Sequence, residues 1–229
     1  MGTITVQANA NKAWLILQDT QGAGGVRWSA AEMLGWHNDG QREILMVLPS
    51  AYTKATKATP VASETRQTLA GMSVTDGLQI IRPTRNFNSA GTIPGRAITK
   101  IPHAVLDQEK PAWHSETATE AIHYTSDPAD PKAIYLWPAI TGGGKVEIVY
   151  SATAPDVAAI GDVIALDDIY SNALQYYMLF RALAKRTANS APARQEAAAY
   201  YNLMLQVLGV KDRITMGTDQ AQTAMGQQA

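Results

Sequence analysis

The hydrophobic pattern of this 229-residue chain changes its period twice, and this change constrains the fold more than any other feature. Before Pro49 and after Leu166, apolar residues recur every three or four positions, as on one face of an amphipathic helix. Between Ala51 and Pro155 the chain is rich in Thr, Pro, Gly and β-branched residues, and several segments alternate with period two. The pattern therefore predicts helices at both ends and a β-rich middle.

The clearest helix signal in the first part is a capping box, with Ser29 as N-cap and Glu32 at the third helical position. Pro49 ends this helix because proline cannot donate the next backbone hydrogen bond. Gly40 on its apolar face indicates that another backbone passes close by. The predicted apolar face consists of Met33, Trp36, His37, Gly40, Ile44, Val47 and Leu48. We expect His37 to be a hydrogen-bonded core or interface residue.

A shorter helix is predicted before it, over residues 11–20, with Asn9 or Asn11 as its cap. The middle region then carries six candidate strands, and residues 141–144 resemble a hairpin loop between the last two. The same glycines followed by Lys145 do not form a phosphate-binding loop, because Val146 replaces Ser or Thr. The candidate strands are residues 65–70, 78–83, 97–102, 121–124, 133–137 and 145–150.

Two helices are predicted near the end of the chain, one beginning at Leu166 and one opening at Ser190-Ala191-Pro192 and closing at Gly209. Together they predict an αα-hairpin. Adjacent residues on a helix point about 100° apart, so only one tyrosine of a neighbouring pair can face the core. The other is a candidate subunit-interface residue. The two pairs are Tyr176 with Tyr177 and Tyr200 with Tyr201.

These elements predict an α+β fold. A helical bundle is built from the N- and C-terminal helices and carries an inserted antiparallel β-sandwich or barrel-like region. The expected parts are N-terminal helices in residues 1–50, a β-rich insertion in 51–160, a helical hairpin in 161–209 and a flexible tail in 210–229. The tail is rich in Gln, Thr, Gly and Ala and has no aromatic residue, so it can bury little surface.

Composition excludes several classes of function. The chain has no cysteine, which excludes disulfides and thiolate chemistry. Its net charge is -1, unlike that of a protein whose main task is to grip nucleic acid. It has no apolar stretch near the roughly eighteen residues that span a membrane. Four basic residues in the middle region could form a solvated face or touch passing DNA or an acidic partner; they are Arg82, Arg85, Arg96 and Lys100.

No recognised catalytic or metal-binding motif is present, and no cofactor is expected. His114 and His123 share the middle region with Glu116 and Glu120, but their spacing fits no metal site. Asp127 and Asp130 flank prolines as turn formers do. One alternative of a different class stays open, a hydrolase or carbohydrate-binding module in the β region; its residues would be His114, His123, Glu116 and Asp127.

The chain resembles the head-to-tail adaptor (connector) family of tailed bacteriophages. One passage, Asn38 with Gln41-Arg42, Ile44 and Pro49, is similar to that family's "N-x-x-Q-R-x-I…P" opening helix. Gly40 departs from the pattern, where a helix former is usual. The further passages are Leu106-Asp107 with Pro111-Ala112-Trp113, Ile134-Tyr135-Leu136-Trp137-Pro138 with Val146-Glu147-Ile148-Val149-Tyr150, and the closing helices in 170–186 and 195–209.

The resemblance implies a structural virion protein and no enzyme. Such adaptors form a ring, commonly twelve-fold, beneath the portal and join the DNA-filled capsid to tail or neck proteins, with DNA passing through without sequence-specific binding. The implied location is the virion neck, with assembly in the host cytoplasm. A C-terminal segment commonly enters portal grooves; the candidate residues here are Lys211, Arg213, Ile214 and Met216. Another phage neck or tail-completion protein is the nearest alternative.

Overall fold

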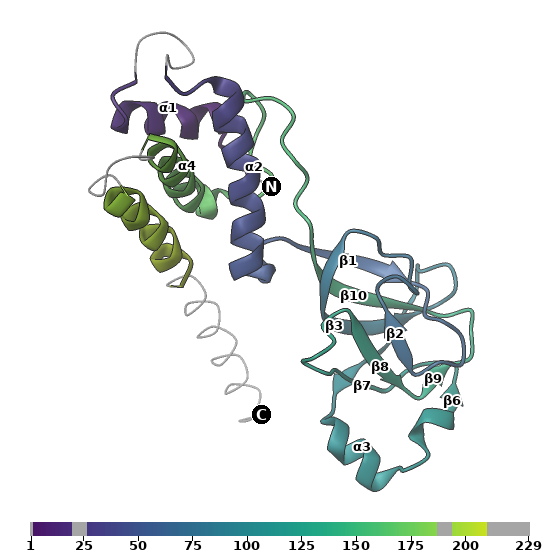
Figure 1. The fold of residues 1–229 in the computed structure, drawn as a ribbon. Helices are drawn as coiled ribbons and strands as arrows, with labels where there is room; N and C mark the ends of the chain where they lie inside the picture. The colour runs from purple at the N-terminus through teal and green to yellow at the C-terminus, as the bar shows by residue number, and fades with distance from the viewer. Residues whose placement is uncertain (1, 20–26, 187–193, 210–229) are drawn as a thin grey trace, which may run out of the picture. The chain divides into compact units, whose positions relative to one another are not determined.

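The computed structural model describes residues 2–19, 27–186 and 194–209 of the chain (Figure 1). The chain divides into two compact units. We call Tyr52–Thr153 the β unit, and Met1–Ala51 together with Ala154–Ala229 the helical unit. The β unit is one continuous stretch of chain, whereas the helical unit is assembled from both ends. The helices and largely antiparallel sheets of the chain confirm the predicted α+β class.

The first helix, α1, spans Val6–Ile16, so the predicted range of 11–20 was displaced toward the C-terminus. Its N-cap is Thr5, not one of the asparagines, and the Thr5 hydroxyl accepts a hydrogen bond from the first turn at 3.2 Å. Thr5 is extended because it pairs with Val163, a long-range bridge that local sequence patterns do not reveal. The helix ends before Gln18, whose φ of 55° is incompatible with a continuing α-helix.

Helix α2 spans Ala30–Val47 and confirms the predicted capping box. The Ser29 hydroxyl accepts a hydrogen bond from the Glu32 amide at 3.3 Å, and the Glu32 carboxylate accepts one from the Ser29 amide at 3.1 Å. Two amides at the start of the helix are thereby satisfied. The helix stops before Pro49, as predicted, and a short 3₁₀ turn, η1 (Pro49–Ala51), follows.

Gly40 is buried on α2, where another helix packs against it, as the prediction of a close neighbour requires. Its near neighbours are side chains of α4 (Ser171–Arg186). A Cβ atom at position 40 would lie 3.0 Å from Cδ1 of Tyr177 and 3.4 Å from Cδ2 of Leu174. Gly40 thus makes room for an aromatic ring between two helices.

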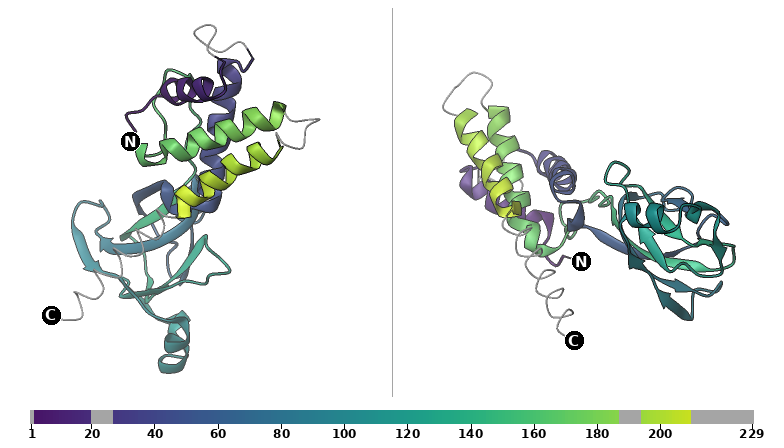
Figure 2. Two further views of the ribbon diagram at one scale, coloured as in Figure 1. Left: turned by 90° about the vertical axis from the view of Figure 1, so that its left-hand side faces the viewer. Right: turned by 90° about the horizontal axis from the view of Figure 1, so that it is seen from below.

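Helix α4 begins later than predicted, because a 3₁₀ turn, η3 (Asp168–Tyr170), precedes it. Ile169, in this turn, is 55% exposed. The chain is helical again through residues 194–209, and this helix lies beside α4 (Figure 2). The predicted helix start at Pro192 and the predicted flexible tail in 210–229 lie outside the described residues.

One buried cluster joins α1, α2 and α4. It contains Trp14 of α1, Met33 of α2 and Met178 of α4, and the Trp14 indole donates a hydrogen bond to the Trp28 carbonyl at 2.9 Å. Because α1 and α2 precede the β unit and α4 follows it, the two stretches of chain bury their apolar faces against each other. The helical unit therefore needs both ends of the sequence.

The β unit contains two four-stranded sheets and one pair of short parallel strands. Except for the parallel pair β5–β7, neighbouring strands in the four-stranded sheets are antiparallel. In order, the first sheet has β1 (Thr53–Ala58), β10 (Lys145–Ala152), β3 (Gly77–Phe87) and β4 (Pro94–Ala97). The second has β2 (Arg66–Thr68), β8 (Ala133–Trp137), β7 (His123–Thr125) and β5 (Thr99–Lys100). The short pair is β6 (Thr117–Ala118) and β9 (Ala139–Ile140).

Two strand predictions came closest to the structure. Strand β8 has the predicted bounds, and β10 begins as predicted but continues to Ala152. The hairpin prediction for residues 141–144 was wrong, because β8 and β10 belong to different sheets. Sequence reasoning also missed β1, whose Thr- and Lys-rich sequence lacks a period-two pattern, and the helix α3 (His103–Glu109).

The two larger sheets of the β unit share one apolar core. Val146 and Ile148 of β10 contribute from the first sheet, and Ile134 and Leu136 of β8 from the second. All four side chains are almost completely buried. The β unit therefore has a hydrophobic core made only of its own residues.

Candidate interaction surface of the helical unit

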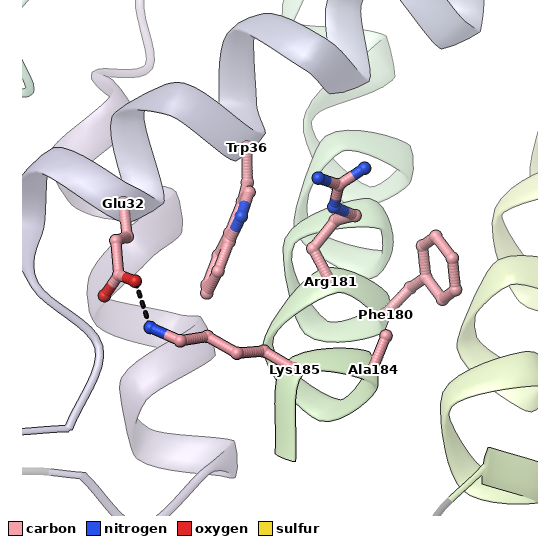
Figure 3. Close-up of a pocket in the computed structure, with 6 residues that line it drawn as sticks. All are labelled: Glu32, Trp36, Phe180, Arg181, Ala184 and Lys185. Atoms are coloured by element: carbon pink, nitrogen blue, oxygen red, sulfur yellow. Dashed lines mark hydrogen bonds and ion pairs between the residues drawn. The ribbon is translucent and has the colours of Figure 1, made fainter. Parts of the chain in front are cut away.

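A groove of about 390 Å³ lies between α2 and α4 on the helical unit (Figure 3). Trp36 is half-buried at its centre, and Phe180 lies on the side toward the helix at 194–209. The groove therefore combines an aromatic surface with charged groups at its edge. The residues that line it are Glu32, Trp36, Phe180, Arg181, Ala184 and Lys185.

The charges around this groove are partly paired. The Lys185 ammonium donates a hydrogen bond to the Glu32 carboxylate and, with Ser29, holds the pKa of Glu32 below its usual range. Arg181 approaches Asp39 at 3.8 Å and lies over the ring of Tyr177 at 6.0 Å. Both cationic groups stay about half exposed. A Trp and an Arg in one accessible groove are typical of protein interfaces.

The predicted interface tyrosines lie where α4 meets the helix at 194–209. The rings of Tyr176 and Tyr200 are 6.3 Å apart, and those of Phe180 and Tyr201 are 5.2 Å apart. The Tyr201 hydroxyl donates a hydrogen bond to Glu43 at 2.7 Å, which raises the pKa of Tyr201. Tyr176, Tyr200 and Tyr201 are half-buried and keep part of their rings on the surface.

Tyr177 differs from the other three because it is 5% exposed and packs against Gly40 of α2. Burial raises the pKa of its hydroxyl. Tyr176 and Tyr177 therefore point in different directions, as their adjacent positions on a helix require. The four residues Lys211, Arg213, Ile214 and Met216 lie outside the described residues.

The polar residues of the opening-helix motif clamp the chain that returns from the β unit. Asn38 donates a side-chain hydrogen bond to the Val157 carbonyl at 3.1 Å and accepts one from the Val157 amide at 2.9 Å. Gln41 accepts a hydrogen bond from the Ala165 amide at 3.1 Å. Arg42 binds the carboxylate of Asp156, with its closest contact at 2.5 Å. These motif residues hold the helical unit together.

The candidate residues for a hydrolase or sugar-binding site make separate hydrogen bonds. His114 is hydrogen-bonded to Thr65 at 2.8 Å, and His123 to Thr99 at 2.6 Å. Asp127 accepts a hydrogen bond from the amide of Ala129 two residues on, as a turn former does. In the part of the chain that the structure describes, no hydrogen bond or ion pair joins two of these candidate residues, and no group of three or more potential metal ligands occurs.

Glu116 and His123 come nearest to a shared site, because both contact Trp137. The Trp137 indole donates a hydrogen bond to Glu116 at 3.0 Å, and the His123 ring stacks on it with centroids 5.6 Å apart. A general base must lie within hydrogen-bond distance of the proton that it abstracts, and here both groups are engaged with the same indole. The contacts are those of a packed aromatic surface.

The described surfaces carry aromatic and charged side chains of the kind that protein interfaces use. The sequence matches the profile of the SU10 adaptor protein family over residues 5–228, nearly the whole chain. The chain belongs to this family, a family of phage head-to-tail adaptors. No curated protein matches the sequence. None of the helices that the structure describes is long and apolar enough to cross a membrane.

Proposed function

We propose that this protein forms a ring beneath the portal of a tailed phage and joins the DNA-filled capsid to the tail. The observation that carries the proposal is the family match over residues 5–228. The ring, its expected twelve-fold symmetry, the binding to portal and tail or neck proteins and the passage of DNA all belong to the proposal. So does the location in the virion neck after assembly in the host cytoplasm.

The helical unit offers the surface that a ring would use. A ring interface is heterologous, so each subunit needs two different faces. The groove around Trp36 is one aromatic face, and the exposed edges of Tyr176 and Tyr200, whose rings lie 6.3 Å apart, form another. Trp, Tyr and Arg are enriched at the centres of interfaces because they bury large areas and still make polar contacts. We infer that the groove receives the neighbouring subunit.

The test is to mix the purified full-length chain with the portal protein of the same phage and to image the mixture by cryo-EM. We expect a closed ring of this protein on one end of the portal. A complex with a tail protein but none with the portal would contradict the proposal and would indicate a tail-completion protein. Mass photometry of the chain alone would show whether the ring forms before the portal is present.

A substitution in the groove tests whether it is the subunit interface in the same experiment. Arg181→Glu reverses a charge beside Trp36, and we expect it to reduce ring occupancy on the portal at least tenfold. Lys12→Glu is the matched control, because Lys12 is an exposed residue of α1 outside the groove and gives the same change in net charge. Equal loss of rings in both variants would exclude the groove as the subunit interface.

A further inference from the structure

We propose that a basic pocket on the β unit binds phosphate groups of double-stranded DNA. The pocket has a volume of about 320 Å³ and lies where β3, the chain at β5 and β7 meet. Ile98 and Tyr124 are both less than a tenth exposed and form its apolar part, while Arg82 and Lys100 are exposed. The lining residues are Arg82, Pro83, Thr84, Ile98, Lys100 and Tyr124.

An irregularity in the sheet accompanies the exposure of two arginines of β3. Residues three apart on a regular strand face opposite sides, so Arg82 and Arg85 could not both be exposed on one face. Strand β10 pairs Ile148 with Pro83 but the preceding Glu147 with Arg85, so the register shifts at this point. A bulge of this kind re-aims side chains. Here Pro83 is buried, and the arginines on either side are exposed.

The cations of this surface are not neutralised by the protein. In the ranges that the structure describes, no carboxylate lies within ion-pair distance of any of four basic residues: Arg82, Arg85, Arg96 and Lys100. Other cations of the β unit do have such partners, as Arg66 has Asp130 at 2.5 Å. Glu147 is opposite Arg85 in the strand register, but its carboxylate accepts a hydrogen bond from Thr84.

The field of Arg82 reaches into the pocket. Burial raises the pKa of Tyr124, and the positive charge of Arg82 acts in the opposite direction. An anion placed between Arg82 and Lys100 would relieve the repulsion between these like charges and would be held against a rigid sheet. The phenol of Tyr124 and the cations are all hydrogen-bond donors that suit phosphate oxygens.

The distribution of these cations favours a polyanion over a small anion. They lie on β3, β4 and β5, so a single phosphate in the pocket would leave Arg85 and Arg96 unneutralised. Double-stranded DNA carries about one charge per 1.7 Å of its axis and can supply several phosphates at once. Strand and loop cations without an element shaped for a groove give phosphate contacts and no base readout. Under the proposed function, double-stranded DNA passes the protein, and this inference rests on that proposal.

The experiment measures binding of the full-length chain to a fluorescent DNA duplex by anisotropy over a series of salt concentrations. We expect the Arg82→Gln, Lys100→Gln double variant to bind roughly tenfold more weakly at low salt. Its slope of log affinity against log salt should be smaller by about 2, because each lost phosphate contact removes about 0.9. Arg85→Gln alone should reduce the slope by about 1.

The matched control is the Arg66→Gln, Lys110→Gln double variant. It removes the same charge from the β unit, but both residues are paired with carboxylates, Asp130 and Glu116. Equal weakening by this control, or no DNA binding by the natural chain, would overturn the proposal. So would tighter binding to a polyglutamate peptide, since that would assign the surface to an acidic protein. Ring formation on the portal, measured on the same variants, should be unchanged, which separates this inference from the proposed function.

Discussion

Two glycines of α2 differ in what surrounds them. A Cβ at position 35 would have no neighbour within 4 Å, whereas a Cβ at position 40 would lie 3.0 Å from the ring of Tyr177. Ala is favoured over Gly in a helix by about 1 kcal/mol. We therefore expect Gly35→Ala to raise the free energy of unfolding by about that amount. The free energy of unfolding of Gly40→Ala should be at least about 1 kcal/mol lower than that of Gly35→Ala, because overpacking against Tyr177 opposes the gain in helix propensity. Urea unfolding of both variants gives the comparison directly.

His37 is fully buried on α2, as predicted. Gln41 is the polar side chain beside its ring, and within the described residues no group meets a strict hydrogen-bond geometry with either ring nitrogen. Burial lowers the pKa of His37 to about 4, and the nearby Gln41 side chain opposes this shift only in part. The folded state thus holds a neutral ring, while the unfolded chain takes up a proton as the pH falls below about 6.5. The stability contributed by neutral His37 is complete above pH 6.5 and is lost as the pH falls toward 4.

From this shift we expect the free energy of unfolding to fall by about 2–3 kcal/mol between pH 7 and pH 4.5 through His37 alone. In His37→Gln, which cannot titrate, the decline over this range should be smaller by that amount. His114→Gln, a change of an exposed histidine, is the matched control and should keep the decline of the natural chain. A His37→Gln profile parallel to the natural one would show that the ring is not neutral in the fold.

Among the helical elements, the contact between α2 and the returning chain depends on Asn38. Asn38→Ala removes the donor to the Val157 carbonyl and the acceptor of its amide. We expect a loss of about 2 kcal/mol in the free energy of unfolding, because backbone groups lose partners in a partly buried place. Amide exchange at Val157 should also accelerate. Asn172→Ala, on the exposed side of α4, is the control and should leave both measurements nearly unchanged.

Local signals in the sequence predicted the elements that depend on neighbouring residues. The capping box of Ser29 and Glu32 and the stop at Pro49 involve contacts within one turn of helix. The start of α1 depends instead on Thr5 pairing with Val163, and Asp168 binds the amide of Thr3 at 2.8 Å rather than capping its own helix. Contacts this far apart in sequence leave no periodic signal, so they could not be predicted.

The candidate surfaces were predictable only in part for the same reason. Arg82 and Lys100 were identified as a basic concentration, but the bulge that exposes Arg82 beside a pocket appears only in the strand register. Trp36 was assigned to the apolar face of its own helix, and Phe180 lies on a different helix. The groove that they share requires the packing of α2 on α4, which one helical period does not specify.

At the scale of the whole molecule, the ends of the β unit lie side by side. The Ala152 amide donates a hydrogen bond to the Tyr52 carbonyl at 3.0 Å, and β1 and β10 run antiparallel from there. Its core is made entirely of its own side chains. The helical unit, by contrast, buries Trp14 and Met33 against Met178, which lies beyond the β unit in sequence. Folding of the β unit should therefore be independent of the rest of the chain.

We expect a fragment of residues 52–153 to fold alone, with a β-type circular dichroism spectrum and a cooperative thermal transition. A fragment of residues 154–229 should show little helix, because α4 lacks α1 and α2 to cover its apolar face. The full chain with residues 52–153 replaced by a short Gly-Ser linker should recover the helical spectrum, since the linker joins two points that the β unit already holds together. An unfolded 52–153 fragment beside a folded linker variant would contradict independent folding of the β unit. It would mean that the β strands need the helical unit as a template, although the helical unit folds without them.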